Sequence, residues 1–137
     1  MADLSGIVFD DDVSALGPAD VDGFFEGWPR VPSAERFLRI LDGSHAVVLA
    51  REGDGGRVVG FVNAISDGEL AAHIPLLEVL PEYRQRGIGT ELVRRMLDKL
   101  NGFAMVDLTC DAELVPYYER FGMLPVSGMV MRDPAAL

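Results

Sequence analysis

The chain has 137 residues, enough for one domain with a single hydrophobic core, so we expect residues 1–137 to form one domain. Aspartate and glutamate number 22 against 12 lysines and arginines, and the net charge of −10 argues against nucleic acid and membrane surfaces as partners. The single cysteine, Cys110, excludes an internal disulfide and a multi-cysteine metal site. We expect no bound metal. We also expect a cytoplasmic protein, because the sequence shows neither a long apolar run nor a leader in which basic residues precede an apolar stretch.

The charges are unevenly distributed along the chain. The first 29 residues carry seven acidic side chains and no basic one, whereas residues 84–99 carry five basic side chains against two acidic ones. We therefore expect the first segment to favour cations and the second segment to favour anions.

The first third of the chain predicts a short strand followed by two helices. Residues 7–9 form an apolar run that ends at an acidic triplet, and a helix is expected from Pro18 to about residue 25, with proline in its first turn. Ser33 is a good N-cap for a second helix, which Gly43 ends.

The remaining elements predict a sheet with helices on both faces. Residues 46–50 and 58–65 are rich in β-branched side chains and flank a glycine-rich turn, which is typical of a hairpin. A third strand at 70–80, a long amphipathic helix from Gly87 or Gly89 to Leu100, a strand at 104–110, a helix at 113–121 and a final strand or pair at 123–131 follow. This order predicts an α/β (α+β) fold with a mixed, mostly antiparallel sheet of six to seven strands and about four helices.

A glycine-containing turn, YRQRGIGT at residues 83–90, joins the third of these long strands to the long helix. Two glycines at i and i+2 allow a tight turn whose N–H groups point outward at the positive end of the helix dipole, where they favour an anion. The alternative is a plain turn that caps the helix. A P-loop and a dinucleotide-binding loop are excluded, because the first lacks its Lys-Ser/Thr pair and the second its third glycine.

Two motifs in the chain resemble those of the GCN5-related N-acetyltransferases (GNAT). Residues 84–89, RQRGIG, fit the coenzyme-loop pattern Q/R-x-x-G-x-G/A, and residues 114–123, LVPYYERFGM, are similar to a later motif of the family. The resemblance covers roughly residue 45 to the end. It implies a GNAT-like fold and transfer of an acetyl group from acetyl-CoA to a primary amine, with a small molecule as the expected acceptor, by direct attack in a ternary complex. The alternatives are a protein or peptide N-acetyltransferase and a non-catalytic acyl-CoA-binding module.

The resemblance also implies where the coenzyme binds. Backbone N–H groups from Gln85 to Thr90 would hold its pyrophosphate, and the backbone at Val79 and Leu80 would bind the pantetheine arm and polarise the thioester carbonyl. Basic side chains near the turn would add charge. The expected cofactor-binding residues are Val79, Leu80, Arg84, Gln85, Arg86, Gly87, Ile88, Gly89 and Thr90.

Three residues are candidates for proton transfer. Tyr118 matches the family's tyrosine, which donates a proton to the departing CoA thiolate. His73 is one candidate base, because imidazole is the side chain most often used for proton transfer near neutral pH, and it shares a strand face with Val79 if the strand is regular. Glu78 is the second candidate, although it lies on the opposite face unless a bulge intervenes. A water relay is the third option.

Aromatic residues in the acidic N-terminal segment are the candidates for acceptor binding. Phe25 and Trp28, together with nearby carboxylates, would form a mouth suited to a cationic amine. The alternative is that the aromatic rings fill the core. A homodimer that pairs the C-terminal strands of two chains is a further arrangement open to this sequence.

Overall fold

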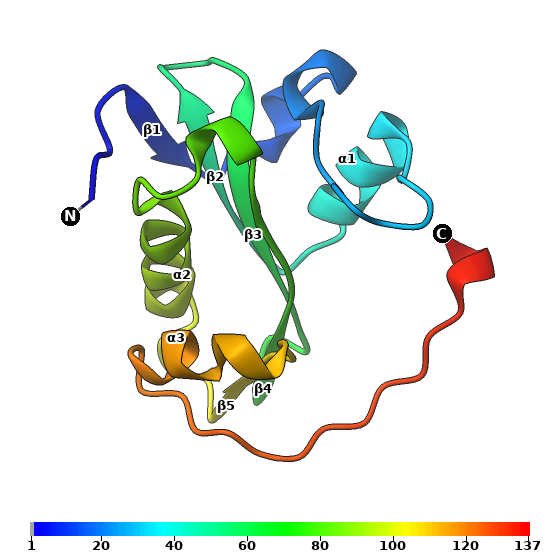
Figure 1. Ribbon diagram of the computed structural model, residues 1–137, viewed down its shortest axis with the longest axis vertical. Helices are drawn as coiled ribbons and strands as arrows, with labels where there is room; N and C mark the ends of the chain where they lie inside the picture. The colour runs from blue at the N-terminus through cyan, green and yellow to red at the C-terminus, as the bar shows by residue number, and fades with distance from the viewer. Residues whose placement is uncertain (1) are drawn as a thin grey trace.

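Figure 1 shows a twisted sheet with helices packed around it in the computed structural model, which describes residues 2–137. The five strands lie in chain order across the sheet, and only the last pair is parallel. The mixed, mostly antiparallel sheet is confirmed, with five strands in place of six to seven. The elements are β1 (Ile7–Asp10), α1 (Ala34–Asp42), β2 (Ala46–Glu52), β3 (Val58–Ser66), β4 (Ala71–Val79), α2 (Ile88–Lys99), β5 (Met105–Asp107) and α3 (Val115–Glu119).

Local sequence sets the limits of the two longer helices. Ser33 caps α1 by accepting a hydrogen bond from the Arg36 N–H at 3.1 Å, and Gly43 follows its last residue. α2 begins directly after Gly87, whose φ is +87°. No helix within residues 2–137 combines the length and the apolar character needed to cross a membrane.

The two longer helices pack on opposite faces of β3. Phe61 contacts Phe37 of α1 with ring centroids 4.7 Å apart, and Phe24 stands edge-on against Phe61 at 5.2 Å. The preceding residue, Gly60, faces α2, where an added Cβ would lie 3.1 Å from Leu92. Because successive strand residues point to opposite faces, β3 separates an aromatic layer from an aliphatic one.

β4 contains an extra residue close to Pro75. Between His73 and Leu76, three steps along β4 face only two steps along β3. Proline suits this bulge because it has no N–H to donate to the ladder. The extra residue reverses the alternation of side chains, so His73 lies on the same face as Glu78. The expectation that His73 shares a face with Val79 is therefore wrong.

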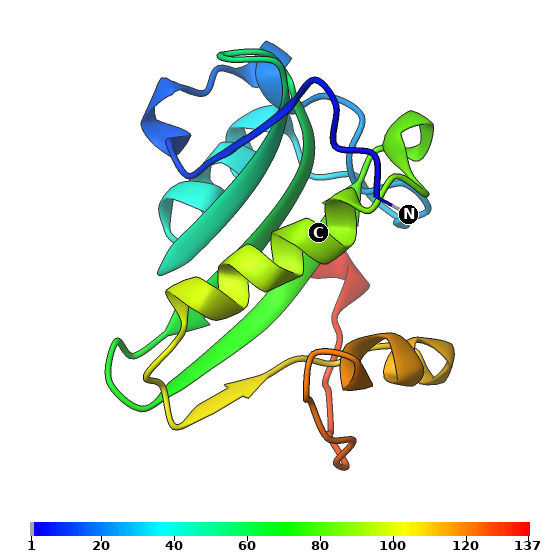
Figure 2. The same cartoon turned by 90° about the vertical axis from the view of Figure 1, so that its left-hand side faces the viewer.

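β5 pairs with only the first part of β4. The parallel register runs from Ala71 opposite Met105 to His73 opposite Asp107. Beyond that point the chain leaves the edge of β4, and Figure 2 shows the two strands separating as the chain runs toward α3. The second half of β4 therefore keeps an open edge on this side.

Three segments differ from the sequence-based expectation. Residues 123–131 run as an extended segment without a strand partner, which lowers the strand count. The expected first helix is reduced to a short 3₁₀ turn, Pro18–Val21, because Gly23 then takes a left-handed φ of +91°. α3 covers Val115–Glu119, in place of the longer helix expected at 113–121.

The acidic N-terminal segment pairs with the basic residues that were expected to stand apart from it. Lys99 of α2 lies 2.7 Å from the Asp11 carboxylate, and Arg84 lies 2.9 Å from Glu26. The expected separation into a cation-favouring and an anion-favouring region is therefore wrong. The fold brings the two segments together, so that much of their charge is mutually neutralised.

Glu91 generates a prediction about stability. Hydrogen bonds from Arg94 and then Arg95 lower its pKa to about 2. We expect Glu91→Gln to lower the free energy of unfolding at pH 7 by about 1 kcal/mol, as for two helix ion pairs. A depressed carboxyl pKa stabilises the fold above the ordinary value near 4.5. That contribution is lost as the pH falls toward 2.

Urea unfolding of parent and variant across this pH range measures the effect, and the difference should shrink in acid. Glu35→Gln, an exposed glutamate in the first turn of α1, is the matched control. Both glutamates lie in the first turn of a helix, where a negative charge interacts favourably with the helix dipole. An equal loss of unfolding free energy in both variants would mean that this interaction, and not the arginine contacts, accounts for the effect of Glu91.

Candidate active site

The open edge of β4 presents backbone groups to the gap beside β5. The Leu80 N–H donates to the Val59 C=O of β3 at 2.8 Å. Because hydrogen-bond directions alternate along an antiparallel strand, the N–H and C=O groups of Val79 and Leu77 point to the opposite edge. An extended ligand can bind such an edge through its own amide groups, as an added strand does.

A groove of about 400 Å³ lies along this edge. Its walls come from β4, from residues between β5 and α3, and from Tyr118 of α3. Phe61 of β3, Trp28 and Arg132 complete them. Its size lies within the range of small-molecule sites, roughly 300–1,000 Å³. The residues used below are Trp28, Glu78, Cys110, Asp111, Tyr118 and Arg132, all of which line it.

Tyr118 reaches the groove from α3. Burial raises the pKa of its hydroxyl above the ordinary value, and the neighbouring Tyr117 and Cys110 raise it further. The hydroxyl therefore keeps its proton at neutral pH. A half-buried, protonated phenol in a groove can act as a proton donor to a developing anion.

Glu78 reaches the same groove from β4. It is the cross-strand partner of Phe61, so its side chain lies on the aromatic face of the sheet. Both carboxylate oxygens accept the Phe25 N–H, at 2.9 and 3.0 Å. Burial raises the pKa of Glu78 despite these hydrogen bonds and the nearby Arg84. A carboxylate with a raised pKa is a better proton acceptor than an exposed one.

Phe25 and Trp28 occupy different positions relative to the groove. Phe25 has a left-handed φ of +66°, which directs its N–H toward Glu78, and its ring is only 2% exposed. That ring stands edge-on beneath Trp28, with centroids 5.1 Å apart. Only Trp28 lines the groove. Phe25 was expected to contact an acceptor, but its ring is part of the aromatic core and does not reach the groove. It packs instead against the Trp28 ring.

His73 lies at the other end of β4. Its Nδ1 is 2.6 Å from the Asp107 carboxylate, and both side chains are exposed. The β3 residues opposite His73 and Glu78 are Ile65 and Phe61, four positions or about 13 Å apart, and His73 does not line the groove. The structure therefore brings Tyr118 and Glu78 to one groove and leaves His73 outside it.

The turn before α2 has the backbone geometry of an anion site. Gln85 and Gly87 have left-handed φ angles of +64° and +87°. The Glu91 N–H bonds to the Gly87 C=O at 3.1 Å, so the N–H groups of residues 88–90 precede the helical ladder. Such groups at the positive end of a helix favour negative charge.

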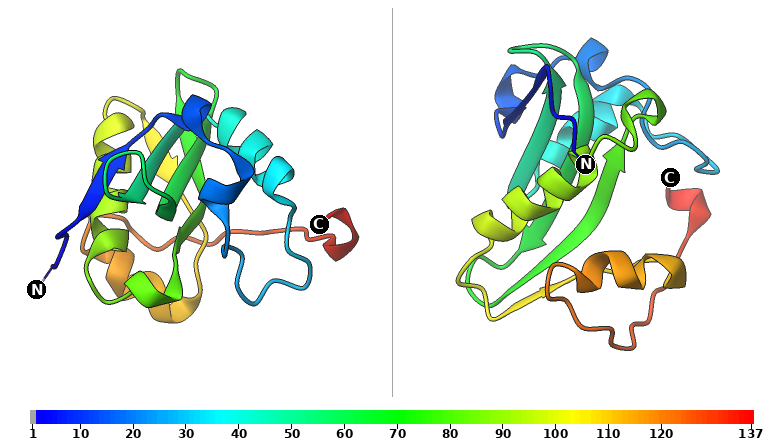
Figure 3. Two further views of the ribbon diagram at one scale, coloured as in Figure 1. Left: turned by 90° about the horizontal axis from the view of Figure 1, so that it is seen from above. Right: turned by 60° about the vertical axis from the view of Figure 1, so that its left-hand side comes forward.

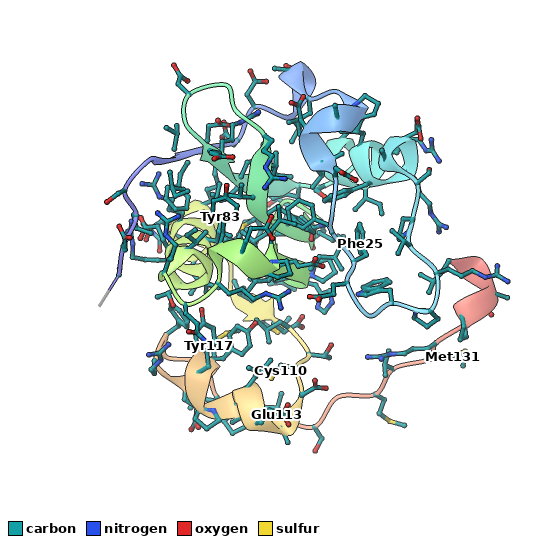
Figure 4. All side chains as sticks on the ribbon, turned by 45° about the horizontal axis from the view of Figure 1, so that its top comes forward. Phe25, Tyr83, Cys110, Glu113, Tyr117 and Met131 are labelled. Atoms are coloured by element: carbon teal, nitrogen blue, oxygen red, sulfur yellow. The ribbon has the colours of Figure 1, made fainter. Side chains whose placement is uncertain are left out.

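Tyr117 links α3 to this turn, a role that the sequence did not indicate. Its hydroxyl lies 3.1 Å from Thr90 Oγ1, and an added Cβ at Gly89 would lie 3.9 Å from the same hydroxyl. Figure 4 labels Tyr117 on the segment that forms α3. Neighbouring residues on a helix point about 100° apart, so Tyr117 and Tyr118 serve the turn and the groove separately.

Arg84 and Arg86 are held by neighbouring parts of the chain. The Arg84 guanidinium donates to the Val79 C=O at 3.0 Å and to the Glu26 carboxylate at 2.9 Å. Arg86 donates to the Asp3 C=O at 2.9 Å. Their expected role of supplying charge for a phosphate is therefore weakened, because each already carries structural hydrogen bonds.

Asp111 and Arg132 also line the groove, although the sequence did not indicate them, and Cys110 lines it at the end of the strand expected near the pantetheine arm. Cys110 and Asp111 follow β5, and Arg132 follows the extended segment 123–131. No sequence pattern indicates Asp111 or Arg132, because their place depends on the path of the chain after β5 and α3. Within residues 2–137 no three side chains of His, Cys, Asp or Glu are grouped so that they could hold a metal ion.

Comparison with known proteins relates these features to a family. The sequence profile of the Acetyltransferase (GNAT) family matches residues 14–123. No curated protein matches the chain. Among solved structures, a protein from Deinococcus radiodurans R1 assigned as an acetyltransferase is 48% identical, with a TM-score of 0.92 over 98% of this chain and 94% of that chain.

Two more distant structures share the fold. A GNAT-family acetyltransferase from Streptococcus pneumoniae TIGR4 is 25% identical, with a TM-score of 0.71 over 93% of this chain and 96% of that chain. Glucosamine-6-phosphate N-acetyltransferase from Arabidopsis thaliana is 19% identical, with a TM-score of 0.68 over 93% and 97% of the two chains. The profile match over most of the chain shows that this protein belongs to the GNAT acetyltransferase family.

Proposed function

We propose that this chain transfers an acetyl group from acetyl-CoA to the primary amine of a small molecule, by direct attack within a ternary complex. The observation that carries the proposal is a single groove in which Tyr118 and Glu78 lie beside the open backbone edge at Leu77. The volume of about 400 Å³ supports a small acceptor. A cytoplasmic location stays a prediction.

The residues present fit acetyl-CoA, which supplies the activated acetyl thioester when it is bound. The N–H groups of residues 88–90 can hold phosphate oxygens at the start of α2. The outward N–H groups of Leu77 and Val79 can pair with the amides of the pantetheine arm. Arg84 supports this edge by bonding to the Val79 C=O at 3.0 Å.

Tyr118 and Glu78 take complementary roles in this proposal. Tyr118 donates its proton to the departing thiolate, and Glu78 accepts a proton from the acceptor ammonium, directly or through a water molecule. The raised pKa of each supports its role, because Tyr118 stays protonated and Glu78 becomes more basic. His73 is the less favoured base, because it pairs with Asp107 outside the groove.

Two alternatives remain distinct from this proposal. A protein or peptide N-acetyltransferase needs a groove open along an extended chain, whereas Trp28 and Arg132 approach this groove from two separate segments. A non-catalytic acyl-CoA-binding module needs no proton donor, yet Tyr118 lies in the groove with a raised pKa. The homodimer expected from the sequence stays a proposal, and it rests on the extended segment 123–131.

Removal of the Tyr118 hydroxyl tests the proton donor. We expect Tyr118→Phe to lower kcat about 100-fold, because the leaving thiolate loses its acid. The rise in melting temperature on addition of acetyl-CoA should be retained. Release of free thiol from acetyl-CoA, measured over a panel of small amines, amino acids and peptides, checks the expectation.

Tyr83→Phe is the matched control for this experiment, because it removes a hydroxyl outside the groove-lining set. Full turnover by Tyr118→Phe would exclude the tyrosine as the acid. A parent chain that acetyl-CoA does not stabilise would overturn the proposed function, and stabilisation without turnover of any acceptor would favour the binding module.

The pH dependence of kcat/KM tests the base. Because burial raises the pKa of Glu78, activity should fall with decreasing pH in a range above that of an ordinary carboxyl. We expect Glu78→Gln to remove this acid limb and to lower kcat/KM at neutral pH by about 10- to 100-fold. Glutamine keeps an acceptor oxygen for the Phe25 N–H. If His73→Gln removes the limb and Glu78→Gln does not, His73 is the base.

A glycine substitution tests the turn before α2. An added Cβ at Gly87, where φ is +87°, would lie 2.8 Å from the Ala2 Cβ, so the turn must shift. We expect Gly87→Ala to weaken acetyl-CoA binding about tenfold, a change of roughly 1.4 kcal/mol, measured by isothermal titration.

Gly68→Ala is the matched control for this variant. Gly68 has a similar φ of +82°, but an added Cβ there meets nothing within 4 Å. Both variants carry the backbone penalty of roughly 1–2 kcal/mol, and only Gly87→Ala displaces the turn. Equal coenzyme affinity in the two variants would show that the turn does not hold the phosphates.

A further inference from the structure

The groove of the candidate active site contains both signs of charge. Glu78 and Asp111 contribute carboxylates, and Arg132 contributes a guanidinium. Among the described residues, no other charged side chain lines the groove, whose remaining walls are mainly apolar and aromatic. In such a site the few charged groups fix the orientation of a ligand. An acceptor that enters the groove is therefore oriented by two carboxylates and one guanidinium.

Arg132 differs from the arginines that other parts of the chain hold in place. Arg51 lies 2.8 Å from the Asp10 carboxylate, and Arg84 lies 2.9 Å from that of Glu26. Within residues 2–137, the Arg132 guanidinium takes part in no ion pair and no hydrogen bond, even though Asp111 lines the same groove. A guanidinium is always charged and presents five N–H donors. Those of Arg132 are thus available to a ligand.

The segment that follows Arg132 attaches the backbone beside it to α1. Asp133 begins the C-terminal 3₁₀ turn by accepting the Ala135 N–H at 3.0 Å, and Arg36 of α1 donates to the Ala136 C=O at 2.7 Å. The left view of Figure 3 shows this turn on the same side of the sheet as α1, with α2 on the other side. Since the proposed phosphate site lies at the start of α2, Arg132 approaches the groove from the side away from it.

Glu78 lies on the same face of the sheet as α1. Its cross-strand partner is Phe61, whose ring packs against Phe37 of α1. The proposed proton acceptor and Arg132 therefore belong to the α1 side of the groove, whereas Tyr118 reaches the groove from α3. An acceptor whose amine lies at Glu78 can present a second group to Arg132.

The balance of charge in the groove indicates what this second group is. A guanidinium binds carboxylates and phosphates alike, through two parallel hydrogen bonds. A phosphate monoester carries a charge of about −1.5 to −2 at neutral pH, which exceeds the charge of one guanidinium, and Glu78 and Asp111 would repel the remainder. A carboxylate carries a single negative charge, and the ammonium of the same molecule compensates one of the two acidic side chains. The groove therefore favours a carboxylate.

We infer that the acceptor is an amino carboxylate, whose amine is acetylated and whose carboxylate Arg132 binds. This inference rests on the proposed acetyl transfer and assigns a substrate class to it. The amine nitrogen forms a bond to the acetyl carbon as the thioester C–S bond breaks, its proton passes to Glu78, and the thiolate takes the Tyr118 proton. The carboxylate is unchanged by these steps. Arg132 selects and orients the acceptor and takes no part in the bond changes.

Matched pairs of acceptors test the inference. Each pair consists of an amino carboxylate and its primary carboxamide, drawn from α-amino acids and short straight-chain ω-amino acids and compared at equal concentrations of free amine. For at least one pair, kcat/KM should be about 10- to 100-fold higher for the carboxylate, as expected for a charge-assisted hydrogen bond.

Substitution of Arg132 should abolish this preference through KM. In Arg132→Gln, KM for the preferred carboxylate should rise about 10- to 100-fold, with kcat within about twofold of the parent value. KM for the matching carboxamide should change far less, because that group carries no charge. Arg132→Lys should show a smaller rise, since an ammonium keeps the charge but not the planar pair of donors.

Arg30→Gln is the matched control, because it removes the same charge from an exposed arginine outside the groove-lining set. An equal rise of KM in Arg30→Gln and Arg132→Gln would mean that net charge alone acts on the acceptor, and would overturn the inference. Equal use of carboxylates and carboxamides would also overturn it. Preference for O-phosphoethanolamine over every amino carboxylate would assign the guanidinium to a phosphate instead.

Binding measured without turnover separates this inference from the proposed reaction. Titration calorimetry of each amino carboxylate, with the chain saturated with CoA, should detect binding that Arg132→Gln weakens about tenfold or more. Such binding without acetylation of any acceptor would overturn the proposed reaction and leave the carboxylate site standing. Acetylation of amines without preference for a carboxylate would do the reverse. The absence of both binding and acetylation would overturn both.

Discussion

The active-site edge of this protein depends on unequal pairing of one strand. β4 pairs with β3 along most of its length but with β5 only from Ala71 to His73. If β5 continued alongside β4, its backbone C=O groups would accept hydrogen bonds from the N–H groups of Leu77 and Val79. The early separation leaves these groups without a partner strand, and Leu77 lines a groove to which α3 contributes Tyr118. The backbone groups that β5 leaves unpaired on β4 are thus free to bond to an extended ligand.

The extra residue near Pro75 has a second consequence on the opposite side of β4. It places Glu78 on the aromatic face, where the carboxylate meets the Phe25 N–H at 2.9 Å. Phe25 adopts a left-handed backbone that costs an aromatic residue roughly 1–2 kcal/mol. The hydrogen bonds and the buried ring offset that cost, so the loop that carries Trp28 is bound directly to the candidate base. These hydrogen bonds join the Trp28 loop to β4 at Glu78.

The sequence predicted the local features of the site better than the relations between distant segments. The helix periodicity and the glycines located α2 and its turn, and the family resemblance pointed to Tyr118. The sheet face on which His73 lies was predicted wrongly, because the bulge in β4 shifts the alternation of side chains. In the sequence, Pro75 indicates only that one backbone N–H donor is absent. The role of Tyr117 at Thr90 depends on where α3 docks. Residues 123–131 were expected to form a strand because of their apolar pattern, but a strand also needs a neighbouring edge, which no local pattern reveals.

The distribution of charge shows how an acidic protein can still bind a polyanion. With a net charge of −10, the chain repels phosphates at long range, although salt screens that repulsion beyond about 10 Å. Arg84 and Arg86 are already bonded within the protein, so side-chain charge is a weak basis for recognition. Backbone N–H groups at the start of α2 remain, and their attraction acts over one helical turn. In the proposed function, recognition at this turn would depend on the left-handed geometry of Gln85 and Gly87, which the net charge does not alter.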